Sequence, residues 1–275
     1  MVVARSSPDT RAALGARSGR KRAAADLLLP RETSIKARRS NAAKSTAVLE
    51  RLARAIPRPH VELTFEDPWQ LLVAVILSAQ STDRRVNLVT PELFRRWPTP
   101  AALGAAEPDE VETVIKSTGF FRNKTKAIRS ASAMIAERWG GQVPRSVPEL
   151  LEIPGIARKS ANVVLGGGFG VTAGIATDTH AMRVARRLRL TLEAAPEKIE
   201  ADLCKHFPRE SWTKLGLRLV LYGRYVCTAR APDCKNCPLN EVCPSRLTKP
   251  EGSWQERADR QAAEMEPRAQ GFVRP

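Results

Sequence analysis

The spacing of apolar residues predicts helices through most of the chain. The run from Trp69 to Leu77 is apolar on nearly every side, which is typical of a helix at a domain centre, and Asp67-Pro68 before it is a strong helix start. Apolar residues three and four positions apart predict amphipathic helices at Ala127, Ala131, Met134 and Ile135 and at Ala181, Val184, Ala185 and Leu188. Alternating strand patterns are almost absent, so the predicted fold class is all-α.

A short helix and a tight turn are predicted between residues 146 and 160. Ser146-Val147-Pro148-Glu149 is a capping box that opens a helix running to about Glu152, and Pro154 ends it. Gly155 permits a tight turn, and the next helix begins near Arg158 with unpaired N–H groups that suit a phosphate. A plain corner between two helices of a bundle is the alternative interpretation.

Charge narrows the range of partners. The chain has 275 residues, with 45 Lys and Arg against 29 Asp and Glu, a net charge of +16 and a pI near 10.3, which favour nucleic acid or an anionic membrane surface. Aromatic residues make up only 5%, which argues against a broad base-stacking platform. The longest strongly apolar run, Leu71 to Leu77, is too short to span a bilayer, and no secretory signal pattern opens the chain. We therefore expect a cytoplasmic protein without a membrane partner.

Both ends of the chain differ in composition from the middle. Residues 1–44 carry 11 Lys and Arg against three acids and lack sustained apolar periodicity, so we predict a disordered basic tail. A transit peptide is the alternative, and the acids Asp9, Asp26 and Glu32 count against it. Residues 249–275 are polar, with mixed charge, and we predict a second tail there that frays.

Four of the five cysteines crowd into 17 residues near the C-terminal end. Their spacing is C-x6-C-x2-C-x5-C, at Cys227, Cys234, Cys237 and Cys243. In a cytoplasmic protein such a cluster indicates a metal site rather than disulfides, although the spacing does not separate zinc from an iron–sulfur cluster. Cys204 lies outside the pattern and is expected in the core.

Several motifs together resemble the endonuclease III family of DNA glycosylases. They are the hairpin IPGIARKSANVVL from Ile153 to Leu165, the segment Ile76 to Asp83, the segment Thr177 to His180 and the four-cysteine loop, in the family's order and spacing from about Ser45 to Pro244. The resemblance implies two helical domains that flank a DNA-binding cleft. Residues 61–171 would form a six-helix barrel with the helix-hairpin-helix motif, and residues 45–60 plus 172–248 a domain with a [4Fe–4S] cluster loop.

The resemblance also implies an activity and its catalytic residues. The protein would be a bifunctional DNA glycosylase and abasic-site lyase, a monomer associated with the bacterial nucleoid, acting on double-stranded DNA that contains an oxidised pyrimidine or an abasic site. Lys159 would be the nucleophile and Asp178 the catalytic carboxylate across the cleft. A helix N-terminus and the neighbouring Arg158 both disfavour a protonated Lys159, as a nucleophile requires. An Asp before an amphipathic helix is ordinarily only an N-cap, which is compatible with catalysis if one oxygen serves each role.

Further residues are assigned to DNA by the same resemblance. Gln80 and Phe120 would enter the base stack, and Ser78, Asp83 and His180 would line the base pocket, although His180 is also read as a structural hydrogen-bonding residue. The predicted backbone and phosphate contacts are Gly155, Ala157, Arg158 and Arg230. Two departures from the family affect these contacts. Ala157 stands where a second glycine is common and needs a negative φ. The stretch between the first two cysteines keeps only Arg230 as a basic residue, for which Arg224 and Lys235 could partly compensate.

Three other functions remain open at this point. A pyrimidine-dimer glycosylase of the same lysine type is not separable by sequence, because the base pocket is not readable. A mismatch adenine glycosylase resembles this scaffold but lacks the hairpin lysine and carries a further C-terminal domain. A non-catalytic DNA-binding protein with a zinc knot would share the charge and the hairpin, but it would not need Asp178 facing Lys159.

Overall fold

The computed structural model describes residues 31–270, with side chains for residues 42–268, and within that part it contains helices and loops but no strand. The prediction of an all-α fold is confirmed. The α-helices are α1 (Arg31–Ala55), α2 (Pro68–Leu77), α3 (Asp83–Arg96), α4 (Pro100–Ala105), α5 (Pro108–Ile115), α6 (Phe121–Trp139), α7 (Val147–Glu152), α8 (Arg158–Phe169), α9 (Thr179–Arg187), α10 (Pro196–His206), α11 (Trp212–Tyr225) and α12 (Trp254–Gln270). Short 3-10 helices lie at η1 (Lys116–Thr118), η2 (Arg209–Ser211) and η3 (Asn240–Val242). None of these helices has the length and apolar character that crossing a bilayer requires.

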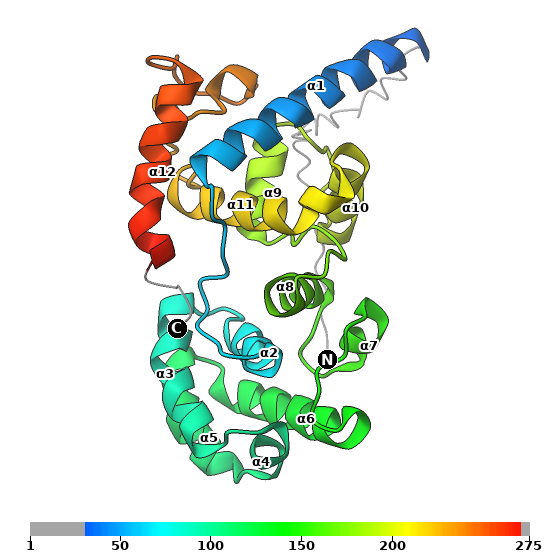
Figure 1. Ribbon diagram of the computed structural model, residues 1–275, viewed down its shortest axis with the longest axis vertical. Helices are drawn as coiled ribbons and strands as arrows, with labels where there is room; N and C mark the ends of the chain where they lie inside the picture. Colours follow the sequence, from blue (N-terminus) through cyan, green and yellow to red (C-terminus); the bar gives the residue numbers. More distant parts are fainter. Residues whose placement is uncertain (1–30, 271–275) are drawn as a thin grey trace, which may run out of the picture.

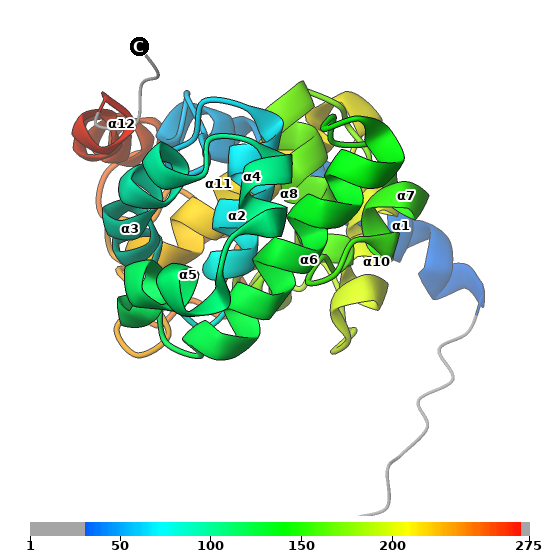
Figure 2. The same cartoon turned by 90° about the horizontal axis from the view of Figure 1, so that it is seen from below.

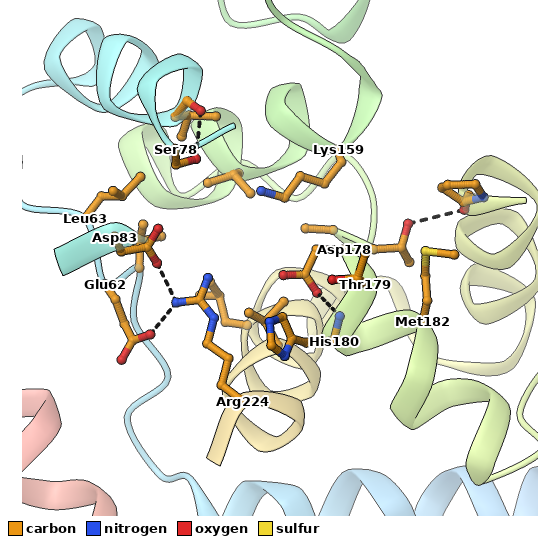
Figure 3. Close-up of a pocket in the computed structure, with 18 of the residues that line it drawn as sticks. Glu62, Leu63, Ser78, Asp83, Lys159, Asp178, Thr179, His180, Met182 and Arg224 are labelled. Atoms are coloured by element: carbon orange, nitrogen blue, oxygen red, sulfur yellow. Dashed lines mark hydrogen bonds and ion pairs between the residues drawn. The ribbon is translucent and has the colours of Figure 1, made fainter. Parts of the chain in front are cut away.

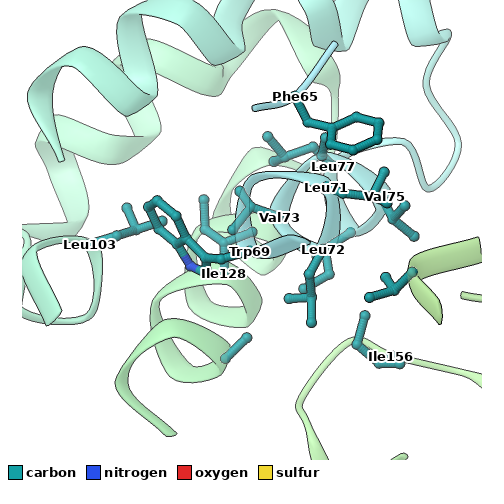
Figure 4. Close-up of a cluster of buried hydrophobic side chains, with 14 of the residues drawn as sticks. Phe65, Trp69, Leu71, Leu72, Val73, Val75, Leu77, Leu103, Ile128 and Ile156 are labelled. Carbon is teal, nitrogen blue, oxygen red and sulfur yellow. The ribbon is translucent and has the colours of Figure 1, made fainter. Parts of the chain in front are cut away.

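Helix α2 forms the centre of a first hydrophobic core. Eight of its ten residues are buried, and they point to all sides of the helix (Figure 4). The Trp69 indole donates a hydrogen bond to Ser132 Oγ on α6 at 3.0 Å, so the one polar atom of this side chain is satisfied. Helices α3 to α8 supply the other side chains of this core, which runs from Leu63 to Leu165.

A second hydrophobic core is built from both ends of the described chain. It joins Val48 to Ile56 of α1 and its C-terminal end with residues between Ile175 and Met265. Figure 1 shows α1 and α9 to α12 grouped together, with α8 at the boundary to the helices around α2. Seen from below in Figure 2, the helices around α2 lie in front of α10 and α11. The chain therefore passes from the second core into the first and back again.

Side-chain caps and prolines set the helix starts within the first core. Asp67, Thr99 and Ser146 each accept a hydrogen bond from a backbone N–H of the next turn, and a proline follows each of them within two residues. Residues 61–171, all within the described part, hold seven α-helices, where the resemblance implies a six-helix barrel. Two of the seven, α4 and α7, are short helices of six residues each.

The N-terminal boundary predicted for the tail is wrong. Helix α1 already begins at Arg31, and Ser45, Val48 and Leu52 on this helix are buried. The residues before Ser45 include alanine, arginine and lysine, which are good helix formers and extend the helix outward from its packed end. Residues 1–30 of the predicted tail lie outside the described residues.

The C-terminal segment is not the polar tail that the sequence predicts. Helix α12 occupies residues 254–270 and packs along α1, with Arg257, Ala258 and Met265 buried (Figure 1). Its start is a capping box: Glu256 N–H donates to Ser253 Oγ at 3.3 Å, and Ser253 N–H donates to the Glu256 carboxylate at 3.0 Å. Because the buried face of α12 includes the basic residue Arg257, the apolar periodicity of this segment is weak.

Candidate active site

A cleft of about 540 Å³ lies where the two cores meet. Residues from both sides line it. Ser78, Asp83 and Lys159 lie on elements that pack around the first core, and Asp178, His180 and Arg224 lie on elements that pack around the second. The structure therefore brings together the two predicted catalytic residues and the three predicted base-pocket residues. Figure 3 shows their side chains around one common space.

Lys159 points its amine into this cleft. The residue lies in the first turn of α8, is half-buried, and extends toward the space bounded by Ser78, Asp83 and Asp178 (Figure 3). Burial lowers the pKa of Lys159 below its ordinary value, Asp178 and Asp83 act against this, and Arg224 adds to it. Because a lowered pKa leaves more of the amine neutral, a lysine of this kind in a cleft can act as a nucleophile.

Asp178 serves as an N-cap with one oxygen only. Its Oδ1 accepts the N–H groups of His180 at 2.8 Å and Ala181 at 2.9 Å, which starts α9. Because both hydrogen bonds end on Oδ1, Oδ2 is left toward the cleft that it shares with Lys159. The two capping hydrogen bonds thus hold the Asp178 carboxylate in place and occupy only its Oδ1.

A cluster of one arginine and two carboxylates forms the wall opposite Asp178. Arg224 Nη1 donates to Glu62 Oε2 at 2.5 Å and also to Asp83, and Tyr225 Oη donates to Glu62 Oε1 at 2.5 Å. Burial lowers the pKa of Arg224, but Asp83 and Glu62 outweigh burial and raise it above the ordinary value. Arg224 is therefore a permanent cation inside the cleft. The resemblance implies Asp83 at this place, whereas Glu62 lies in none of the sequence motifs and Arg224 is expected from the sequence only as a partial substitute for basic residues of the cysteine loop.

Ser78 and His180 have intramolecular partners. Ser78 Oγ donates to the carbonyl of Val75 at 2.8 Å at the end of α2. His180 Nδ1 lies 3.2 Å from Nη2 of Arg183, which carries the proton, so Nδ1 is the acceptor. This agrees with the structural interpretation of His180, although its ring still lines the cleft.

The hairpin before Lys159 adopts the conformation that its sequence predicts. Gly155 has a φ of +86°, a region that favours glycine, and an added Cβ would lie 3.3 Å from Ile76. Ala157 has a φ of −103° and is the N-cap of α8, so alanine in place of a second glycine causes no strain. No side chain of the described residues caps this helix, which leaves its first N–H groups for a ligand. The Arg158 side chain instead pairs with Glu200 at 3.2 Å.

Gln80 and Phe120 share an uncommon backbone conformation. Among the described residues, three other than glycine have positive φ: Gln80 at 52°, Phe120 at 48° and Arg189 at 49°. Both Gln80 and Phe120 are exposed, Phe120 by 63%, whereas Phe121 packs against the first core. Strained conformations of this kind cluster at functional sites. Of the two adjacent phenylalanines, only Phe120 is therefore free to meet a ligand.

The four cysteines of the C-terminal loop face one hollow. Cys227, Cys234, Cys237 and Cys243 line it together with Arg187 and Asn240. Loss of solvation raises the pKa of the Cys237 thiol to about 12 and raises that of Cys243, and neighbouring cysteine sulfurs act in the same direction. Within residues 42–268, three or more metal-binding groups do not converge closely enough to hold a single ion. Four thiols that line one hollow are a donor set that zinc or an iron–sulfur cluster can use.

Two arginines of α9 attach this loop to the helix that Asp178 starts. Arg183 donates to the carbonyls of Gly223 at 2.6 Å and Cys227 at 3.0 Å. Arg187 donates to the Thr228 carbonyl at 2.7 Å and to Cys227 Sγ at 3.3 Å. Neither arginine is predicted from the sequence, because the apolar pattern of α9 indicates only that both lie on its polar face. Arg230 is exposed in the same loop, whereas Lys235 pairs with Glu251 at 2.8 Å and is committed within the protein.

Comparisons with known proteins agree with this geometry. A family model described as HhH-GPD superfamily base excision DNA repair protein matches residues 73–209. Endonuclease III of Synechocystis sp. is 47% identical over 202 residues, which cover 74% of this chain and 92% of that protein. Endonuclease III of Bacillus subtilis is 42% identical over 71% of this chain and 89% of the relative, and the Escherichia coli K12 protein is 39% identical over 74% and 96%.

Solved structures of the same kind of protein have the same fold. A trapped covalent intermediate of endonuclease III with DNA, in an estranged-adenine complex, matches with a TM-score of 0.69 and 38% identity over 79% of this chain and 97% of the other. A non-covalent endonuclease III–DNA complex matches equally well. A thermostable thymine-DNA glycosylase, with a TM-score of 0.66 and 19% identity over 76% of this chain and 97% of that one, shares the fold alone. The chain belongs to the endonuclease III family of base excision DNA repair enzymes, which are DNA glycosylases and abasic-site lyases.

Proposed function

We propose that this enzyme removes oxidised pyrimidines from double-stranded DNA with Lys159 as the nucleophile. The observation that carries the proposal is the Lys159 amine in the cleft, facing the uncapped oxygen of Asp178. The neutral amine attacks C1′ of the damaged nucleotide, and the bond from C1′ to the base breaks as the base leaves. The nitrogen lone pair then expels O4′, which takes up a proton, so the sugar ring opens and a protonated Schiff base joins Nζ to C1′. Loss of a C2′ proton then expels the 3′ phosphate and nicks the strand.

Asp178 has two functions in this proposal. Its free oxygen takes the proton that the attacking amine loses, and its charge stabilises the positive charge that develops on the sugar. The hydrogen bonds on Oδ1 hold the carboxylate still during both steps. Asp83 is not a substitute base, because Arg224 holds it in an ion pair.

Gln80 and Phe120 are proposed to fill the duplex when the damaged nucleotide leaves the stack. Extrusion costs a few kcal/mol in unstacking, and an exposed apolar side chain that enters a base step offsets part of it. The exposure and left-handed backbone of both residues support this function. The N–H groups of α8 and the exposed Arg230 would hold phosphates on either side, and Ser78, Asp83 and His180 would line the base pocket.

The cysteine loop is proposed to hold a [4Fe–4S] cluster through Cys227, Cys234, Cys237 and Cys243. The four thiols around one hollow fit this group, and bound iron would offset the unfavourable ionisation of the buried thiols. The cluster would cross-link the four cysteines of the loop. Elemental and sulfide analysis of the purified protein should find iron and acid-labile sulfide and no zinc.

The two hydrophobic cores support a division into the domains that the sequence indicates, on either side of the cleft. We propose that one monomer binds one lesion, because residues of a single chain supply both catalytic groups and both inserted side chains. The net charge of +16 favours association with the bacterial nucleoid.

Borohydride trapping tests the function of Lys159. Reduction during turnover on a duplex with one thymine glycol should cross-link wild-type protein to DNA, and Lys159→Gln should abolish both adduct and nicking. An adduct of undiminished yield in the variant would contradict the proposal. Burial lowers the pKa of Lys159, so the folded protein binds that proton less tightly than the unfolded chain, and at pH 7 the charge costs stability. The variant should therefore unfold at the same or a higher temperature, which excludes misfolding as the cause.

A panel of lesions tests the choice of substrate. Base release and strand nicking should be measured separately on duplexes that contain thymine glycol, a cyclobutane pyrimidine dimer or a mismatched adenine. We expect release and nicking on thymine glycol and little on the other two. Preferred incision at the dimer would show instead that the protein is a pyrimidine-dimer glycosylase that uses the same lysine.

A further inference from the structure

The buried carboxylate of Glu200 lines the same cleft as the two catalytic residues and has no part in the proposed chemistry. Its side chain is 6% exposed, on α10, while Ile199 and Leu203 of the same helix belong to the second core. A buried carboxylate is retained only where partners compensate its charge. The identity of those partners indicates what Glu200 does.

Both partners of Glu200 are on the helix that carries Lys159. Arg158 Nε donates to Glu200 Oε1 at 3.2 Å, and Asn162 Nδ2 donates to the same oxygen at 2.9 Å. Arg158 precedes Lys159 directly in the chain, and Asn162, 5% exposed, is one turn further along α8. The first turn of α8 is thereby tied to α10.

The chain between α8 and α9 closes over this contact. A Cβ added at Gly174 would collide with Glu200 Oε1 and lie 2.7 Å from Asn162 Nδ2. On the side that faces Gly174, the backbone leaves no room into which Glu200 or Asn162 could shift. Close packing on this side limits the movement of the contact in that direction.

The first turn of α10 also holds the residue next to Asp178. Thr177, 4% exposed, donates from Oγ1 to the carbonyl of Pro196 at 3.2 Å. Helix α10 therefore contacts the neighbour of the nucleophile through Glu200 and the neighbour of the catalytic carboxylate through Pro196. We infer that Glu200 is a positioning residue that sets the separation of Lys159 and Asp178, and that Arg158 is its partner rather than a phosphate ligand. This inference rests on the proposed function.

The test compares Glu200→Gln, Arg158→Gln and the double variant with wild type. Glutamine keeps the volume of Glu200 and can still accept from Asn162, while the ion pair with Arg158 is lost. We measure the single-turnover rate and the borohydride adduct on a thymine glycol duplex, and the Kd for a duplex with a tetrahydrofuran abasic analogue. Each single variant should lower the rate on the order of 10-fold or more, because small errors in the placement of reacting groups are costly. The Kd should change less than about twofold, well below a tenfold step in binding.

The double variant distinguishes positioning by the Glu200–Arg158 pair from a contact between Arg158 and a DNA phosphate. If the pair acts as a unit, the double variant is no slower than the slower single variant. If Arg158 instead binds phosphate, Arg158→Gln raises the Kd and lowers the salt dependence of binding by about one ion, while Glu200→Gln leaves the rate unchanged. The second result would overturn the inference. Arg158 is 45% exposed in its side chain, so its variant remains informative if Glu200→Gln does not fold.

Two controls keep the interpretation separate from the proposed function. Glu193→Gln makes the same change of charge at an exposed position outside the cleft and should match wild type in rate and Kd. If wild type forms no adduct, or Lys159→Gln still forms one, the proposed function fails. If wild type and Lys159→Gln behave as expected but the Glu200 and Arg158 variants match wild type, only the inference about positioning fails.

Discussion

At the scale of single residues, Arg224 lowers the pKa of Lys159 while Asp83 and Asp178 raise it. Removing the guanidinium in Arg224→Gln deletes the first effect and leaves Asp83 and Glu62 without their cation. Both consequences raise the pKa of Lys159. The pH at which the single-turnover rate is half-maximal should therefore move upward, and the rate at pH 7 should fall by about tenfold for each unit of that movement.

A pH profile of the rate from about pH 6 to 10 checks this expectation, since this range lies below the ordinary lysine pKa of about 10.4 and the pKa of Lys159 is lowered. Lys214→Gln, an exposed change of the same charge on α11, is the control and should leave the midpoint in place. An unshifted midpoint in Arg224→Gln would mean that Lys159 is not the group whose ionisation limits the reaction.

Single residues of the site differ in how far sequence could predict them. Lys159 and Asp178 lie in short motifs, so their functions were inferred before any geometry. The ion pairs of Arg224 join residues 162 and 141 positions away, Glu62 and Asp83, and no local pattern connects such residues. The same holds for Arg158, whose partner Glu200 lies 42 positions further along the chain.

At the scale of elements, α12 depends on one buried arginine. Arg257 is fully buried and donates to the carbonyls of Cys237 at 3.0 Å and Glu251 at 3.1 Å, as well as to that of Gly252 and the Glu241 carboxylate. Arg257→Met would leave these acceptors without a donor. We expect a loss of roughly 3 kcal/mol or more in the free energy of unfolding.

Urea or thermal unfolding followed by circular dichroism measures this loss. Arg260→Met, on the exposed face of the same helix, removes the same charge and should change stability by less than about 0.5 kcal/mol. Equal stability of the two variants would mean that α12 does not depend on the contacts of Arg257.

The sequence predicts helices that combine an N-cap with a clear apolar face, but it does not predict a helix whose buried face contains both polar and apolar residues. Helices α2 and α7 begin at the caps that the sequence indicates, at Asp67 and Ser146. Helix α12 begins at an equally good capping box, at Ser253 and Glu256, but its buried face includes Arg257 and Gln261, so apolar periodicity missed it. This face of α12 is buried because it packs against α1, which lies far away in the sequence.

At the scale of the whole molecule, positive charge extends beyond the described residues. Residues 1–30 carry six Lys and Arg against two Asp, while Ser45, Val48 and Leu52 of α1 belong to the packed body. Deletion of residues 1–30 therefore removes basic charge without cutting into the second core, whereas deletion to residue 44 would shorten α1.

Each basic residue that neutralises a DNA phosphate adds about 0.9 to the slope of log Kd against log salt concentration. The deletion should therefore flatten this slope, by as much as about 5 if all six cations contact phosphates. The Kd of the two proteins should differ most at low salt and converge as salt increases, because screening removes the long-range part of the attraction. The single-turnover rate at saturating protein should stay unchanged, since both catalytic groups lie in the cleft. Fluorescence anisotropy with an undamaged duplex at several salt concentrations measures the slope, and parallel lines for the two proteins would show that residues 1–30 do not contact the DNA backbone.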